Sequence, residues 1–197
     1  MKTRERILHC LLELAAEKGL GNVSLSMVAE KVGIRKATLF SHFESKDDMI
    51  QSLYTYLREQ ARNEQMASVD YDKFVQGKSA GQVLMAVVIG YQTMNSQKDM
   101  SAFYKFIYSE RSINAAAANI MLTETETMLK QTKNLFEAMK KNSLLSFRGK
   151  DIDLASTMFC LTIHELMDIE LDRRLNNMED DGKDIQKFIT GFCELYA

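Results

Sequence analysis

The chain has 197 residues, carries a formal net charge of −2 and contains no proline or tryptophan. Proline and glycine are the strongest chain breakers, and with only nine glycines present the composition favours long helices over a β-sandwich, a β-barrel or a proline-rich linker. The small net charge also excludes a uniformly basic nucleic-acid coat protein.

Positive charge is concentrated near the N-terminus. Residues 1–46 hold eight Lys or Arg and five Asp or Glu, whereas the rest of the chain is net negative. The three cysteines lie far apart without a C-x-x-C pair, which favours a reducing compartment. No apolar run reaches the roughly 18 to 20 residues that a bilayer span needs. We therefore expect a cytoplasmic protein with no membrane partner.

The first fifty or so residues have the periodicity of three short helices and the start of a fourth. Apolar residues at i+3 and i+4 spacing predict a first helix that ends at Gly19. A second short helix over 25–32 is followed by Gly33, where a tight turn is expected. Ser45 and Asp48 have the spacing of a capping box that opens a longer helix.

The remainder of the chain shows helical periodicity without a fixed repeat. A polar segment, 69–81, is expected to be a loop with at most one irregular turn. The predicted fold is all-α, and its longer helices cover residues 45–65, 80–96, 99–110, 113–141, 151–176 and 181–196.

The third short helix, beginning at Arg35, has one polar and one apolar face. The apolar face carries Leu39 and Phe43, and the polar face carries Arg35, Thr38, Ser41 and His42. A short helix with a small basic face, preceded by another helix and a glycine turn, suits insertion into the major groove of DNA. Arg can bond a guanine edge there, while Thr, Ser and Lys can hold phosphates.

This region resembles the DNA-binding domain of the TetR family of transcriptional regulators. The resemblance is carried at fixed spacing by Ala16-Glu17-Lys18-Gly19, Val28-Ala29-Glu30, Val32-Gly33-Ile34, Lys36-Ala37-Thr38-Leu39-Phe40-Ser41-His42-Phe43 and Ser45-Lys46-Asp47-Asp48-Met49. It implies an N-terminal three-helix helix-turn-helix DNA-binding domain, 1–47, and a larger helical effector-binding and dimerisation domain, 48–197. The implied function is a ligand-responsive regulator, most often a repressor that binds a palindromic operator as a dimer.

The resemblance also assigns the DNA contacts. They are Ser24, Arg35, Lys36, Ala37, Thr38, Phe40, Ser41, His42 and Lys46. The chain departs from the usual family pattern at three of these positions. Arg35 stands where the family usually has Ser or Thr, Ala37 replaces Gly, and Phe40 replaces a Tyr whose hydroxyl often contacts phosphate. These departures affect the operator sequence and the contact details.

The second domain is expected to bind an effector and to dimerise. The helices 151–176 and 181–196 carry more apolar surface than one core can take, which predicts a homodimer interface. A flexible, aromatic-edged set of side chains is the expected lining for a small apolar or aromatic effector: Tyr91, Met94, Phe103, Tyr104, Met128 and His164. The alternative is that the methionines fill an irregular core.

Other function classes find little support. No P-loop or dinucleotide-binding glycine pattern is present, so no cofactor is expected. His164-Glu165 begins a zinc-protease pattern whose second histidine is missing, so an enzyme is not expected. A helical small-molecule-binding module with weak or lost DNA binding remains the alternative, because Ala37 and Phe40 depart from the family pattern.

Overall fold

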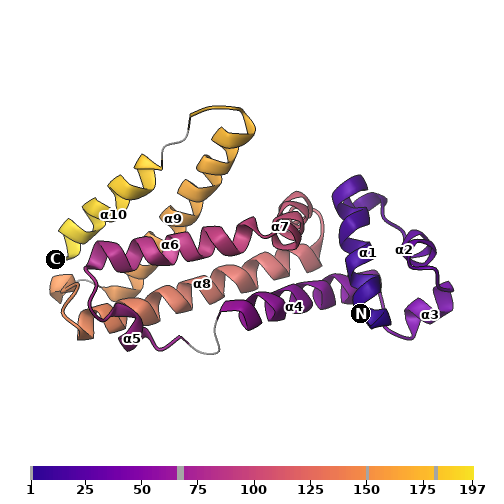
Figure 1. The fold of residues 1–197 in the computed structure, drawn as a ribbon, viewed down its shortest axis with the longest axis horizontal. Coiled ribbons are helices and arrows are strands. Elements are labelled where there is room, and N and C mark those ends of the chain that lie inside the picture. The colour runs from indigo at the N-terminus through magenta and orange to yellow at the C-terminus, as the bar shows by residue number, and fades with distance from the viewer. Residues whose placement is uncertain (1, 66–68, 150, 180–181) are drawn as a thin grey trace. The chain divides into compact units, whose positions relative to one another are not determined.

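The computed structural model describes residues 2–65, 69–149, 151–179 and 182–197, and within these ranges the chain is helical without a strand (Figure 1). The expected all-α fold is confirmed. The α-helices are α1 Thr3–Lys18, α2 Leu25–Val32, α3 Lys36–Phe40, α4 Lys46–Gln65, α5 Tyr71–Val75, α6 Ala80–Ser96, α7 Lys98–Glu110, α8 Ala115–Lys141, α9 Ile152–Leu175 and α10 Lys183–Tyr196. None of the described helices is both long and apolar enough to cross a bilayer.

The predicted helices agree with these bounds to within about two residues at most ends. The exception is the segment 69–81, which contains α5. The Asp70 side chain caps this helix by accepting a hydrogen bond from the Lys73 backbone amide at 3.2 Å. Residue 181, where the last helix was expected to begin, lies outside the described residues.

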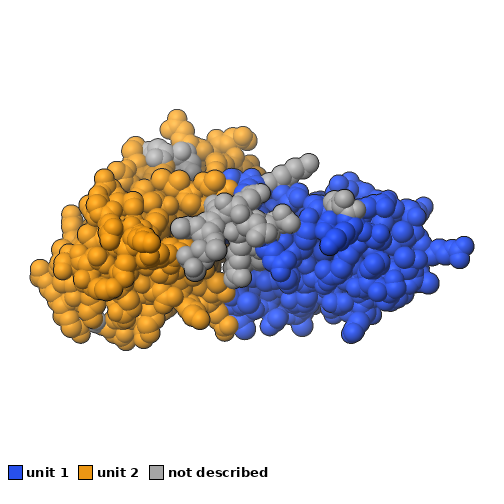
Figure 2. Space-filling view, turned by 60° about the horizontal axis from the view of Figure 1, so that its bottom comes forward, with its two compact units in different colours: residues 1–67, 94–124 blue, residues 68–93, 125–197 orange. Residues whose placement is uncertain are grey.

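The chain divides into two compact units, shown in different colours in Figure 2. Unit 1 comprises residues 1–67 and 94–124, and unit 2 comprises 68–93 and 125–197. The predicted domain boundary after residue 47 stays a prediction. In unit 1, the buried stripes of α1, α4, α7 and the start of α8 meet in a core that includes Ile7, Leu11, Ile50, Phe103 and Ile120.

The core of unit 2 is aromatic. The ring of Phe192 lies 5.5 Å from that of Phe136, 5.0 Å from that of Phe159 and 4.5 Å from that of Tyr196, measured between centroids. These separations are typical of aromatic pairs that contribute beyond their buried area. The face of α10 that carries Phe192 is therefore a core face.

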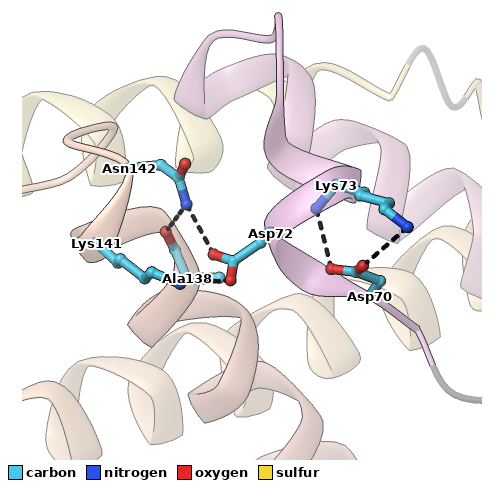
Figure 3. A network of polar contacts seen from close by, with 6 residues as sticks. All are labelled: Asp70, Asp72, Lys73, Ala138, Lys141 and Asn142. Carbon is cyan, nitrogen blue, oxygen red and sulfur yellow. Dashed lines mark hydrogen bonds and ion pairs between the residues drawn. The ribbon is translucent and has the colours of Figure 1, made fainter.

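A polar network closes the surface of unit 2 where α5 meets the end of α8 (Figure 3). Asp72 accepts hydrogen bonds from Lys141 Nζ at 2.6 Å and from Asn142 Nδ2 at 3.0 Å. The bond from Lys141 is the main cause that lowers the pKa of the Asp72 carboxyl below its ordinary value. Because these groups are largely exposed, the network orients α5 and contributes little to stability.

Candidate nucleic-acid interface

The first three helices are held together by side chains on the inner faces of α2 and α3. Val28 and Val32 of α2, Leu39 of α3 and Phe43 just after it are almost completely buried in the unit 1 core. The chain turns between α2 and α3 at Gly33, whose φ of 78° and ψ of 36° lie in the left-handed region. Its amide donates to the carbonyls of Ala29 and Glu30, which ends α2.

A substitution at Gly33 tests this turn. Gly33→Ala is expected to lower the free energy of unfolding by about 1 kcal/mol or more, because an L-residue is strained at positive φ. No atom lies within 4 Å of the position that a Cβ would occupy, so the effect comes from the backbone alone. Urea unfolding measures it. Gly21→Ala is the control, since Gly21 has open space and no positive φ, and an equal loss there would contradict the account.

The outer face of α3 presents the side chains that the sequence assigned to DNA. Arg35, Lys36, Ala37, Thr38, Phe40 and Ser41 are exposed, and His42 is half-buried. Leu39 points into the core, so α3 is divided into an apolar inner face and a polar outer face, as predicted. Within the described part of the chain, the Arg35 and Lys36 side chains make no hydrogen bond or ion pair, and both cations remain available to a partner.

Two hydroxyl groups of the predicted set also serve the local fold. Ser24 Oγ accepts a hydrogen bond from the Met27 amide at 3.2 Å and so caps α2. Ser41 Oγ donates to the Thr38 carbonyl at 2.6 Å, which fixes its rotamer and leaves its lone pairs to accept. Both side chains are exposed, and both are thereby held in defined positions on the surface.

Lys46 has an internal partner that the sequence did not reveal. Its ammonium donates to the Leu20 carbonyl at 2.6 Å and so ties the start of α4 to the 3₁₀ turn Leu20–Asn22. Burial is the main cause that lowers the pKa of Lys46, while Glu110 and Asp47 act in the opposite direction. An ammonium has three donors, so a phosphate contact by Lys46 is compatible with this bond and stays a prediction.

Lys46→Met is expected to affect both stability and DNA affinity, because it keeps the apolar stem and removes the ammonium. Loss of the bond to Leu20 should cost about 1 kcal/mol in urea unfolding. Affinity for all DNA sequences should fall by a similar factor, and the salt slope should decrease by about 1 per lost phosphate contact. Lys105→Met, on an exposed part of α7, is the charge-matched control and should change neither quantity.

Two arginines of α1 that the sequence did not assign also hold the head. Arg6 donates to the Val32 carbonyl at 2.8 Å, and Arg4 donates to Ser52 Oγ at 2.8 Å while its guanidinium lies over the Phe43 ring. The available signal is their place on α1 beside its apolar stripe. That position does not distinguish a structural arginine from a solvated one.

The Ser45 capping box is present in part. Ser45 Oγ accepts from the Asp48 amide at 3.0 Å, as predicted, and the Asp48 carboxylate accepts from the Glu44 amide at 2.9 Å instead of from that of Ser45. The N-terminus of α4 is thus fixed directly after the buried Phe43.

The predicted effector residues fall in both units. In unit 1, Met94 and Phe103 are buried and the Tyr104 hydroxyl donates to Glu124 at 2.8 Å. In unit 2, Tyr91 and Met128 are half-buried, and His164 Nδ1 lies 3.6 Å from a carboxylate oxygen of Asp168. The predicted lining therefore consists of two groups of three, and their common role stays a prediction.

Tyr54 is a further polar residue of unit 1 that the sequence analysis did not single out. Its hydroxyl donates to Glu124, whose side chain is almost completely buried in the core. Together with Tyr104, it gives the Glu124 carboxylate two phenolic donors from α4 and α7. A polar hydroxyl beside the apolar stripe of α4 was the only sequence signal.

The fold and this site define a class of protein: a helix-turn-helix DNA-binding protein with a helical body. Residues 7–53 match the model of the family described as "Bacterial regulatory proteins, tetR family". A curated relative, the "Uncharacterized HTH-type transcriptional regulator YvdT" of Bacillus subtilis (strain 168), is 26% identical over 135 residues, which are 61% of this chain and 70% of the relative.

Solved structures agree with this match at the level of the fold. GusR of Salmonella enterica superposes with a TM-score of 0.71 at 18% identity, covering 98% of this chain and 95% of its own. The multidrug binding protein EbrR, complexed with imidazole, gives a TM-score of 0.60 at 12% identity, covering 98% and 95%. The chain is a TetR-family transcriptional regulator.

Proposed function

We propose that this regulator is a repressor that binds a palindromic operator as a homodimer and is released by a small apolar or aromatic effector. The observation that carries the DNA-binding part is the outer face of α3. Its exposed Arg35 and Lys36 flank hydroxyl-bearing side chains, while Leu39 anchors the helix from behind. The major groove is wide enough to admit such a helix, and Arg, Lys, Thr and Ser are the side chains that bond base edges and phosphates there.

Dimerisation is supported by the apolar side chains that unit 2 leaves exposed. Leu154, Met158 and Leu161 lie at i, i+4 and i+7 on α9, and Leu195 of α10 is also exposed. A shallow groove between α9 and α10 is lined by Met158, Leu166, Phe188 and Leu195, among others. Apolar surface of this kind favours an isologous interface, and two copies of α3 would then meet a site with two-fold symmetry.

The effector is proposed to contact the residues predicted from the sequence. EbrR, which shares the fold, is a multidrug binding protein whose structure contains imidazole, and this supports a small-molecule role for the helical body. Tyr91, Tyr104 and His164 offer polar groups, while Met94, Phe103 and Met128 offer apolar ones. Since such a regulator acts on chromosomal DNA, we also place it in the cytoplasm.

A thermal-shift screen of apolar and aromatic compounds tests the effector. A true effector should raise the melting temperature, by an amount equivalent to about 2.7 kcal/mol at a hundred times its Kd, and lower DNA affinity in the same preparation. Tyr104→Phe, which keeps the ring and removes the hydroxyl that bonds to Glu124, should weaken both effects. A compound that stabilises the protein and leaves DNA affinity unchanged would contradict release by that compound.

Selection of duplexes from a random-sequence library tests the DNA-binding function. The selected sites should contain inverted repeats, and affinity should fall steeply with salt because phosphate contacts release counterions. The alternative, a helical small-molecule-binding module that has lost DNA binding, predicts that no sequence is enriched. Enrichment of a palindromic site would exclude that alternative, and its absence would contradict the proposal.

A further inference from the structure

The largest exposed apolar side chain on α3 is that of Phe40. It is 47% exposed, although Leu39 before it and Phe43 after it are almost completely buried. Ala37, three residues earlier, is exposed on the same side of the helix. The ring of Phe40 therefore lies outside the core of unit 1 and, with the Ala37 methyl, forms a small apolar spot.

The surroundings of this spot are cationic. Arg35 and Lys36 are exposed on the same short helix, and no Asp or Glu occurs between residues 34 and 43. The occupant must therefore be anionic overall and still offer a small apolar group. Double-stranded DNA meets both conditions, because the C5-methyl group of thymine projects into its major groove between two rows of phosphates.

We infer that Phe40, with Ala37 beside it, reads the C5-methyl group of one thymine in each operator half-site. This inference rests on the proposed DNA-binding function and adds a base preference to it. Phe and Ala are among the side chains that contact this methyl in the major groove. The apolar spot is one ring and one methyl group in size, which matches a single methyl on the partner.

The chemistry of the ring supports this reading. A tyrosine, the residue usual at this position in the family, would carry a hydroxyl at the tip of the ring. Phe40 has none, so its ring can be covered by a methyl group without leaving a polar atom buried and unpaired. The departure at this position thus changes the preferred neighbour of the side chain from a phosphate oxygen to an apolar group.

Replacement of thymine by uracil tests the inference, because uracil lacks only the C5-methyl group. The highest-affinity duplex from the library is synthesised with each thymine replaced in turn, and fluorescence anisotropy gives the Kd. For the natural chain, one replacement in each half-site should raise the Kd about fourfold, the effect expected from one buried methyl group. The other replacements should change the Kd little.

The same series is then measured with Phe40→Ala. Because the ring is half-exposed, this variant should keep its melting temperature and its dimer. Its Kd should be the same for thymine and uracil at the sensitive position, while Phe40→Tyr, which keeps the ring, should retain at least part of the difference. Ile113→Ala is the matched control: Ile113 is 80% exposed in the same unit, and its removal should leave the thymine-to-uracil ratio unchanged.

The outcomes separate this inference from the function on which it rests. Equal sensitivity to uracil in the natural chain and in Phe40→Ala would overturn the inference, as would an equal loss of affinity for thymine and uracil duplexes in that variant. In both cases specific DNA binding, and with it the proposed function, would stand. If the library yields no preferred sequence, both fail together.

Discussion

Replacing Arg35 and Lys36 together by alanine is expected to lower operator affinity by about a hundredfold or more. Both side chains are exposed on α3 and make no hydrogen bond or ion pair with the described part of the chain, so their loss should leave the fold intact. A specific base contact contributes about 1–3 kcal/mol, and a dimer would lose each contact twice. Fluorescence anisotropy at a fixed salt concentration measures the loss.

The specificity of this effect is checked by a variant with the same change of charge. Lys105→Ala combined with Arg111→Ala removes two exposed cations from α7 and the residue that follows it in the same unit. Its affinity should fall by far less, because these cations act on DNA only through the general field of the protein. Equal losses in the two double variants would show that α3 has no special role.

Arg35→Ala alone should also change the base preference at one step of each half-site, whereas a lost phosphate contact lowers affinity for all sequences about equally. Repeating the library selection with this variant measures the change. An unchanged preferred sequence with lower affinity would assign Arg35 to a phosphate.

Making the exposed face of α9 acidic is expected to convert the homodimer into a monomer at micromolar concentration. Met158 and Leu161 are 50% and 48% exposed, so Met158→Glu with Leu161→Glu places charges outside the core of unit 2. In an interface, four unpaired carboxylates would be buried around the two-fold axis, at a cost of several kcal/mol. Sedimentation velocity measures the result, and operator affinity should fall with dimerisation because each half-site is then bound alone.

The control for this variant is Ile89→Glu, since Ile89 is 53% exposed in α6 of the same unit and lies outside the proposed interface. It should remain a dimer. Charged substitutions at Phe188 and Phe192 do not serve this purpose, because Phe192 is buried in the aromatic core and its replacement would unfold unit 2. A dimer that survives the α9 changes would contradict the proposed interface.

The sequence predicted the long helices and the division of α3 well, because both depend on local periodicity. Gly19, Gly33 and the Ser45 cap punctuate the N-terminal helices, and Leu39 and Phe43 define one face of a short helix unambiguously. The helix α5 was missed because five residues are too few for a period to be recognised.

The features that the sequence did not reveal depend on contacts between distant residues. Lys46 and Leu20 lie 26 residues apart, and Tyr54 and Glu124 lie 70 apart. Local pattern also cannot orient a helix that is apolar on several sides, as α9 is. Its buried residues, such as Phe159, and its exposed ones, such as Met158, alternate along the chain with similar hydrophobicity. Only the packing of unit 2 distinguishes the core face from the exposed one.

Footprinting of the DNA that flanks this protein's own gene is the most direct test of its function as an operator-binding regulator. We expect two protected half-sites related by dyad symmetry, with centres separated by one DNA turn of about 10 bp or a small multiple of it. The protection should disappear when Arg35 and Lys36 are replaced by alanine. Absence of protection, or uniform coverage without half-sites, at concentrations where the protein is a folded dimer would contradict the account.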